Sequence, residues 1–140
     1  MSIYFHEEDR KIPAIEQKKI IKSVEVFCSN FNKKPGDINF IYCSDEYLLE
    51  MNKNYLAHDY FTDVITFNYC EENFVSGDIF MSRDRIEDNS KKLKVEAEEE
   101  FVRVCAHGLL HLLGLKDDLD VEKEIMRRKE EEFIKITRYF

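Results

Sequence analysis

The chain has 140 residues, of which 44% are hydrophobic and 36% are charged, a composition typical of one globular domain rather than of a disordered chain. Its formal net charge of −8 argues against broad, charge-driven binding to nucleic acid or to an anionic membrane, although it allows a local basic patch. No run of about 18 apolar residues occurs and the N-terminus lacks a secretory pattern, so we expect no membrane-spanning segment and no signal peptide.

The first part of the chain predicts alternating strands and helices. Ser2–Phe5 is expected to form a short strand, and Pro13 suits the first turn of an amphipathic helix. The apolar residues of that helix recur three or four positions apart, at Ile20, Ile21, Val24, Phe27, Cys28 and Phe31. Lys33–Asp37 has the composition of a turn, and the bulky side chains of Ile38–Cys43 predict a second strand.

Ser44 is suited to cap the next helix, because its hydroxyl can accept a hydrogen bond from a free backbone N–H of the first turn. The apolar face of this helix is expected to carry Tyr47, Leu48, Met51 and Tyr55. Two further strands are predicted at Val64–Tyr69 and Gly77–Met81. Because the loop between them is short, we expect an antiparallel hairpin.

Helices dominate the rest of the sequence. Ser82 should cap a short helix that carries Ile86, and a long helix should run from about Val95 to Leu113, with Gly114 at its end. The last helix, about Leu119–Ile136, is expected to bury Val121, Ile125, Phe133 and Ile136. The elements predict an α+β fold, a single domain over residues 1–140 with a small mixed sheet of about four strands covered by about five helices.

The four cysteines are spread singly in apolar segments, at Cys28, Cys43, Cys70 and Cys105. A disulfide framework or a zinc ribbon would require closely spaced pairs. We therefore expect buried, reduced thiols and a cytoplasmic protein.

The segment HGLLHLLGLKDD, which begins at His107, is the most informative one. His107 and His111 lie four positions apart, so on a helix both imidazoles project from one face and can reach one metal ion at roughly 2 Å. The other side chains of this helix are mostly apolar, which predicts that it is buried. Unpartnered polar groups in a core cost about 1–3 kcal/mol each, so the pair favours a bound ion.

Gly114 can adopt the left-handed conformation that reverses the chain after the helix. The following residues can then fold back, which makes Asp117 the expected third ligand and Asp118 its alternative. Two histidines and one carboxylate leave a coordination position open for water, as catalytic metal sites do. Gly108 occupies the position of the glutamate base in HExxH metalloproteases, so peptide hydrolysis by that route is disfavoured.

The same segment closely resembles the HGxLHLxGxDH signature of the YbeY family, bacterial metal-dependent endoribonucleases involved in ribosomal RNA maturation. Met51–Tyr55, TDVITF (Thr62–Phe67) and GDIFMS (Gly77–Ser82) resemble other blocks of that family in the same order, so the resemblance covers about residues 37–118. It implies a zinc-type ion held by three histidines and hydrolysis of single-stranded or ribosomal RNA. It further implies the small ribosomal subunit as a partner and a role in ribosome quality control, with no DNA substrate.

Two residues depart from the family pattern. Asp117 stands where the family has its third histidine, so the ligand set becomes His107, His111 and Asp117, and the oxygen ligand admits Mn, Ni or Fe beside zinc. Leu56 stands where the family has an arginine implied to contact RNA phosphate or stabilise developing charge. His58 is a candidate replacement, and an ordinary solvated loop histidine is the alternative interpretation.

Two other positions are weighed for roles around the ion, and one acidic run is weighed separately. Thr66, on the strand that the resemblance places beside the metal, is a candidate for positioning substrate, or simply an edge hydrogen-bonding group. Asp78 is a candidate for orienting a ligand histidine, or for a strand-end role. The acidic run Glu96–Glu100 is interpreted as a solvated helix start, because the helix dipole favours acids there.

The leading hypothesis is an endoribonuclease in which a bound ion activates water for attack on a phosphodiester. No side chain stands out as the general base. A metal-dependent peptidase and a non-catalytic RNA-binding factor of ribosome assembly are the alternatives.

Overall fold

The computed structural model describes residues 2–13, 15–56 and 62–140, with the side chain of Leu56 excluded. Within these residues four strands and five helices follow one another in the order β1 (Ser2–Glu7), α1 (Gln17–Asn30), β2 (Lys34–Cys43), α2 (Asp45–Leu56), β3 (Val64–Asn68), β4 (Phe74–Ser82), α3 (Arg83–Leu93), α4 (Ala97–Leu112) and α5 (Asp120–Tyr139). The predicted α+β class, strand number and helix number are confirmed. None of these helices is long and apolar enough to cross a membrane.

The strands form one mixed sheet in the order β1-β2-β4-β3. β1 and β4 run parallel to β2, whereas β3 runs antiparallel to β4 with Thr66 opposite Ile79. The predicted hairpin is therefore confirmed. Parallel neighbours need long crossover connections, which α1 provides between β1 and β2 and α2 helps to provide between β2 and β4.

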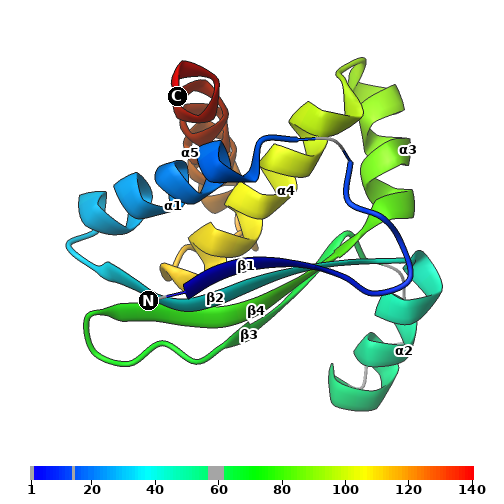
Figure 1. Ribbon diagram of the computed structural model, residues 1–140, viewed down its shortest axis with the longest axis horizontal. Coiled ribbons are helices and arrows are strands. Elements are labelled where there is room, and N and C mark those ends of the chain that lie inside the picture. The colour runs from blue at the N-terminus through cyan, green and yellow to red at the C-terminus, as the bar shows by residue number, and fades with distance from the viewer. Residues whose placement is uncertain (1, 14, 57–61) are drawn as a thin grey trace.

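Helices cover mainly one face of the sheet (Figure 1). α1 and α4 lie on that face, and α5 packs against both of them. Successive side chains of β4 point to opposite faces, so Val75, Ile79 and Met81 enter the main core beneath α4. The other face receives Asp78 and Phe80, and α2 covers part of it through Leu48.

The predicted turn at Lys33–Asp37 is wrong for most of its length. β2 begins at Lys34, and its pairing with β4 shifts register between Pro35 and Ile38. Such an irregularity tolerates proline, because proline donates no hydrogen bond to the ladder. The chain turns instead just after α1, where Asn32 has a left-handed φ of 58°.

The helix caps at Ser44 and Ser82 are confirmed, since their hydroxyls accept the backbone N–H groups of Tyr47 and Arg85. Two predicted helix faces are partly wrong. Tyr55 on α2 is exposed, and so are Val121 and Ile125 on α5. The buried residues of α5 are Met126, Glu130, Phe133 and Thr137. The apolar pattern missed this stripe because it contains two polar residues.

All four thiols are free, as expected for reduced cysteines. Cys28, Cys43 and Cys105 are buried, whereas Cys70 is only half-buried. Burial raises the pKa of the Cys28 thiol to about 11 and that of the Cys43 thiol to about 12.

Candidate metal centre

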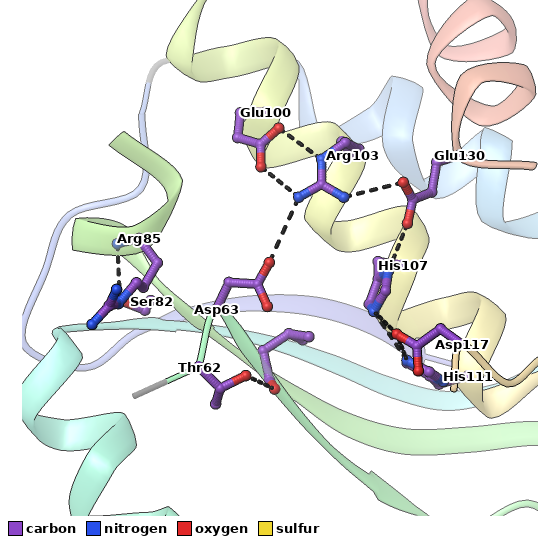
Figure 2. A network of polar contacts seen from close by, with 11 residues as sticks. Thr62, Asp63, Ser82, Arg85, Glu100, Arg103, His107, His111, Asp117 and Glu130 are labelled. Carbon is purple, nitrogen blue, oxygen red and sulfur yellow. Dashed lines mark hydrogen bonds and ion pairs between the residues drawn. The ribbon is translucent and has the colours of Figure 1, made fainter. Parts of the chain in front are cut away.

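The two histidines of α4 and the aspartate that follows the helix bring three donor atoms together (Figure 2). The Nε2 atoms of His107 and His111 lie 3.0 Å apart. Oδ2 of Asp117 lies 3.3 Å from the first nitrogen and 3.5 Å from the second. The cluster could hold a metal ion, as the sequence predicted.

Helix geometry and one glycine produce this convergence. A separation of four positions stacks the two imidazoles on one face of α4. Beyond the helix, Gly114 adopts a φ of 100°, which other residues rarely tolerate. The N–H of Leu115 then donates to the carbonyl of Leu110, so the chain reverses and returns Asp117 to the histidines.

The ring of His111 is oriented by the backbone. Its Nδ1 lies 3.0 Å from the carbonyl oxygen of Leu115. A carbonyl can only accept a hydrogen bond, so Nδ1 carries the proton and donates it. In the neutral ring, Nε2 therefore presents a lone pair to the other two donor atoms.

The ring of His107 is oriented by a buried carboxylate. Its Nδ1 donates to Oε2 of Glu130 over 2.6 Å, and Glu130 is only 4% exposed. Burial lowers the pKa of His107, but the hydrogen bond to Glu130 and the negative charges of Glu130, Asp63 and Asp117 outweigh it and raise that pKa. Glu130 thus favours the ring orientation in which Nε2 faces His111 and Asp117.

Arg103 holds Glu130 in turn. Its guanidinium binds both oxygens of the buried Glu100, at 2.7 and 2.5 Å, and donates to Oε1 of Glu130 at 3.1 Å. One of its nitrogens also lies 3.6 Å from Oδ2 of Asp63. One cation therefore links three carboxylates, and these hydrogen bonds raise the pKa of Arg103 despite its burial.

The donor set fits a transition-metal ion. Ligand atoms around a tetrahedral ion at about 2.0–2.1 Å lie roughly 3.3–3.4 Å from one another. The separations of 3.0, 3.3 and 3.5 Å bracket that range. When both rings are neutral, their Nε2 lone pairs and the Asp117 oxygen face one another, an arrangement that a cation between them would stabilise. The three side chains remain 16%, 25% and 36% exposed, so solvent can reach the cluster.

The glycine between the two histidines has a packing role. A Cβ atom at Gly108 would lie 2.4 Å from Cγ2 of Ile79, because this face of α4 rests on the sheet. A glutamate at this position would therefore meet the core.

The other predicted site residues lie in different places. Asp78 is on the opposite face of the sheet, where its Oδ1 accepts a hydrogen bond from Asn39. Asp78 therefore lies on the wrong side of the sheet to orient a ligand histidine. Glu130 orients the ring of His107 instead, and the carbonyl of Leu115 orients the ring of His111. Thr66 lies on the α4 side of β3, opposite Ile79. His58 lies outside the described residues.

Sequence reasoning missed Glu100, Arg103 and Glu130. Glu100 was interpreted as solvated with its acidic neighbours, yet it is 1% exposed. A signal was present, because Glu100, Arg103, His107 and His111 recur three or four positions apart and form one polar stripe on an apolar helix. Glu130 carried a weaker signal, because it falls on the buried stripe of α5 between Met126 and Phe133, but the exposed Glu131 and Glu132 follow it directly.

Comparisons with known proteins agree with the resemblance described above. A family model described as Endoribonuclease YbeY matches residues 2–138. A protein of that name from Parabacteroides distasonis is 43% identical over 130 residues, which is 93% of this chain and 92% of the relative. Another from Flavobacterium johnsoniae is 53% identical over 102 residues, 73% of each chain. A solution structure from Thermotoga maritima matches with a TM-score of 0.65 and 25% identity, covering 97% of this chain and 89% of that one.

Proposed function

This chain belongs to the YbeY family, and from that premise we propose that it is an endoribonuclease, a hydrolase that cleaves internal phosphodiester bonds during ribosomal RNA maturation. The names of its relatives support this activity and an RNA substrate. Single-strand specificity, a role in ribosome quality control, association with the small ribosomal subunit and a cytoplasmic location are parts of the same proposal.

One observation carries the proposal for this chain. Two imidazole nitrogens and a carboxylate oxygen converge within 3.5 Å at a partly exposed position. A divalent ion held by His107, His111 and Asp117 would activate a water molecule and polarise a phosphate oxygen, the two requirements of phosphodiester hydrolysis.

We propose zinc as the ion, at one per chain. Two nitrogen donors and one oxygen donor are a ligand set found in catalytic zinc sites. The oxygen of Asp117 also suits Mn, Ni or Fe, so a preference among these metals is a measurable property of the site.

Thr66 and His58 are proposed to position the substrate. The position of Thr66, on the same side of the sheet as α4, supports this role. His58 follows Leu56, which stands where the family has an arginine. The replacement of that cation by leucine favours one alternative, a ribosome-assembly factor in which the metal only stabilises the fold. A peptidase is disfavoured, because Gly108 occupies the position at which HExxH metalloproteases carry their glutamate base.

The test is cleavage of a labelled single-stranded RNA by tag-free protein, with and without a chelator and after addition of zinc or manganese. We expect metal-dependent internal cleavage that His111→Ala abolishes while the circular dichroism spectrum is retained. His6→Ala is the matched control, because His6 contacts Asn39 on β2 rather than the cluster. Casein should stay intact.

An assembly factor would behave differently. The wild type would then show no turnover with any metal, and His111→Ala would only lower the melting temperature. That result would overturn the proposed activity.

A further inference from the structure

Asp63 is held at the start of β3 by its backbone. It immediately precedes β3, and its carbonyl accepts the backbone N–H of Ser82 over 3.0 Å, which extends the β3–β4 pairing by one residue. The neighbouring Thr62 donates its hydroxyl to the carbonyl of Val64. The Asp63 side chain thus starts from a well-defined position.

The carboxylate of Asp63 is engaged on one side only. Its Oδ2 lies 3.6 Å from the Arg103 guanidinium, and the side chain is 30% exposed. Among the residues that the structure describes, none forms a hydrogen bond with Oδ1. Figure 2 shows the carboxylate pointing from the start of β3 into the space between Arg103 and His107.

The other carboxylates around the cluster already take part in ligand or hydrogen-bonding contacts. Asp117 supplies a ligand oxygen. Glu130 is buried and shared between His107 and Arg103, and Glu100 is buried and holds Arg103 with both oxygens. Within this described network, Asp63 is the carboxylate that is both solvent-accessible and outside the ligand set.

We propose that Asp63 is the general base of the hydrolysis, a role that rests on the proposed function. Its carboxylate takes a proton from the attacking water while the water oxygen forms a bond to phosphorus. The bond between phosphorus and the leaving ribose oxygen breaks, and that oxygen takes a proton from solvent. The products are a phosphomonoester and a free hydroxyl, with no oxidant or reductant needed.

The charges around Asp63 suit this task. Arg103 on α4 forms an ion pair with one oxygen of Asp63. The same guanidinium also pairs with Glu100 and Glu130. The three donor atoms that converge on the ion position come from His107, His111 and Asp117, so the carboxylate of Asp63 stays free to act on water.

Asp63→Asn tests the role with little change in shape. We expect kcat for RNA cleavage to fall at least about a hundredfold, the usual contribution of a general base. Metal content, melting temperature and KM should stay at wild-type values. Asp88→Asn, which removes an exposed carboxylate on α3, is the matched control and should keep full activity.

Chemical rescue separates a base from a structural residue. Formate added to Asp63→Ala should restore a measurable part of kcat, whereas formate should not accelerate the wild type. Full activity of Asp63→Asn in a protein whose wild type cleaves RNA would overturn this inference alone. Loss of activity together with metal loss, or with no rescue, would assign Asp63 a structural role instead. An inactive wild type would overturn the proposed function and this inference with it.

Discussion

The Nδ1 atom of His107 lies 2.6 Å from Oε2 of Glu130, a contact that joins α4 to α5 directly beside the metal-ligand cluster. Glu130 is 4% exposed, and Arg103 donates a hydrogen bond to its other carboxylate oxygen. A histidine ligand whose second nitrogen donates to a carboxylate is fixed in orientation and is a stronger base toward a metal. The last helix therefore contributes to the site without supplying a ligand.

Replacing Glu130 by glutamine should weaken metal binding. Glutamine retains the size of the side chain but removes the charge that favours the His107 orientation, so we expect zinc affinity to fall about 10–100-fold. Competition with a chromophoric chelator measures this change. Glu131→Gln, an exposed neighbour on the same helix, should bind zinc like the wild type. Equal affinities for Glu130→Gln and the wild type would contradict the role of Glu130.

The same contact predicts a pH dependence of stability in the metal-free protein. Because the pKa of His107 is raised in the folded chain, protonation of its ring stabilises the fold. This contribution is fully present below the unfolded pKa of about 6.5 and is lost as the pH rises through the folded pKa. Urea unfolding in chelator should show the wild type losing stability relative to Glu130→Gln as the pH rises. Parallel profiles for the two proteins would contradict this account.

Arg103 should be far more important for stability than a surface arginine. Arg103→Gln leaves Glu100 and Glu130 buried without their cation, and breaking such a network costs about 3–5 kcal/mol of unfolding free energy. Arg128→Gln removes only an exposed pair with Glu124 and should cost less than about 1 kcal/mol. Chemical denaturation measures both. Similar losses in the two variants would show that the buried network contributes little.

Gly108 should resist substitution for reasons of packing. A Cβ atom there would lie 2.4 Å from Ile79, and overpacking of this kind costs about 1–3 kcal/mol. We therefore expect Gly108→Ala to lower the melting temperature. The double variant Gly108→Ala/Ile79→Ala should lose less unfolding free energy than the sum of the losses in the two single variants. Strictly additive losses would show that α4 does not press on the sheet at this point.

The sequence predicted the parts of the fold that depend on local pattern. The hairpin of β3 and β4, the serine caps at Ser44 and Ser82, and the chain reversal at Gly114 each follow from a few neighbouring residues. The ligand cluster was predictable for the same reason, because eleven consecutive residues from His107 to Asp117 contain it.

Among the residues that support the cluster, Glu130 was the hardest to predict from local pattern. Glu130 lies 23 positions from His107, and only the packing of α5 on α4 brings them together. The role predicted for Asp78 was wrong because successive side chains of β4 alternate between the two faces of the sheet. Ile79 points toward α4, so Asp78 points to the opposite face, away from the metal-ligand cluster. Val121 and Ile125 fit an apolar spacing, but α5 turns a different stripe inward.

The central claim is that His107, His111 and Asp117 hold one divalent ion. Elemental analysis of tag-free protein, purified without chelator, tests it most directly. We predict about one transition-metal equivalent per chain, consistent with a single three-residue ligand set, and its loss in a folded Asp117→Ala variant. A wild type that is isolated without metal and fails to take up zinc, or an Asp117→Ala variant that retains a full equivalent, would contradict the claim.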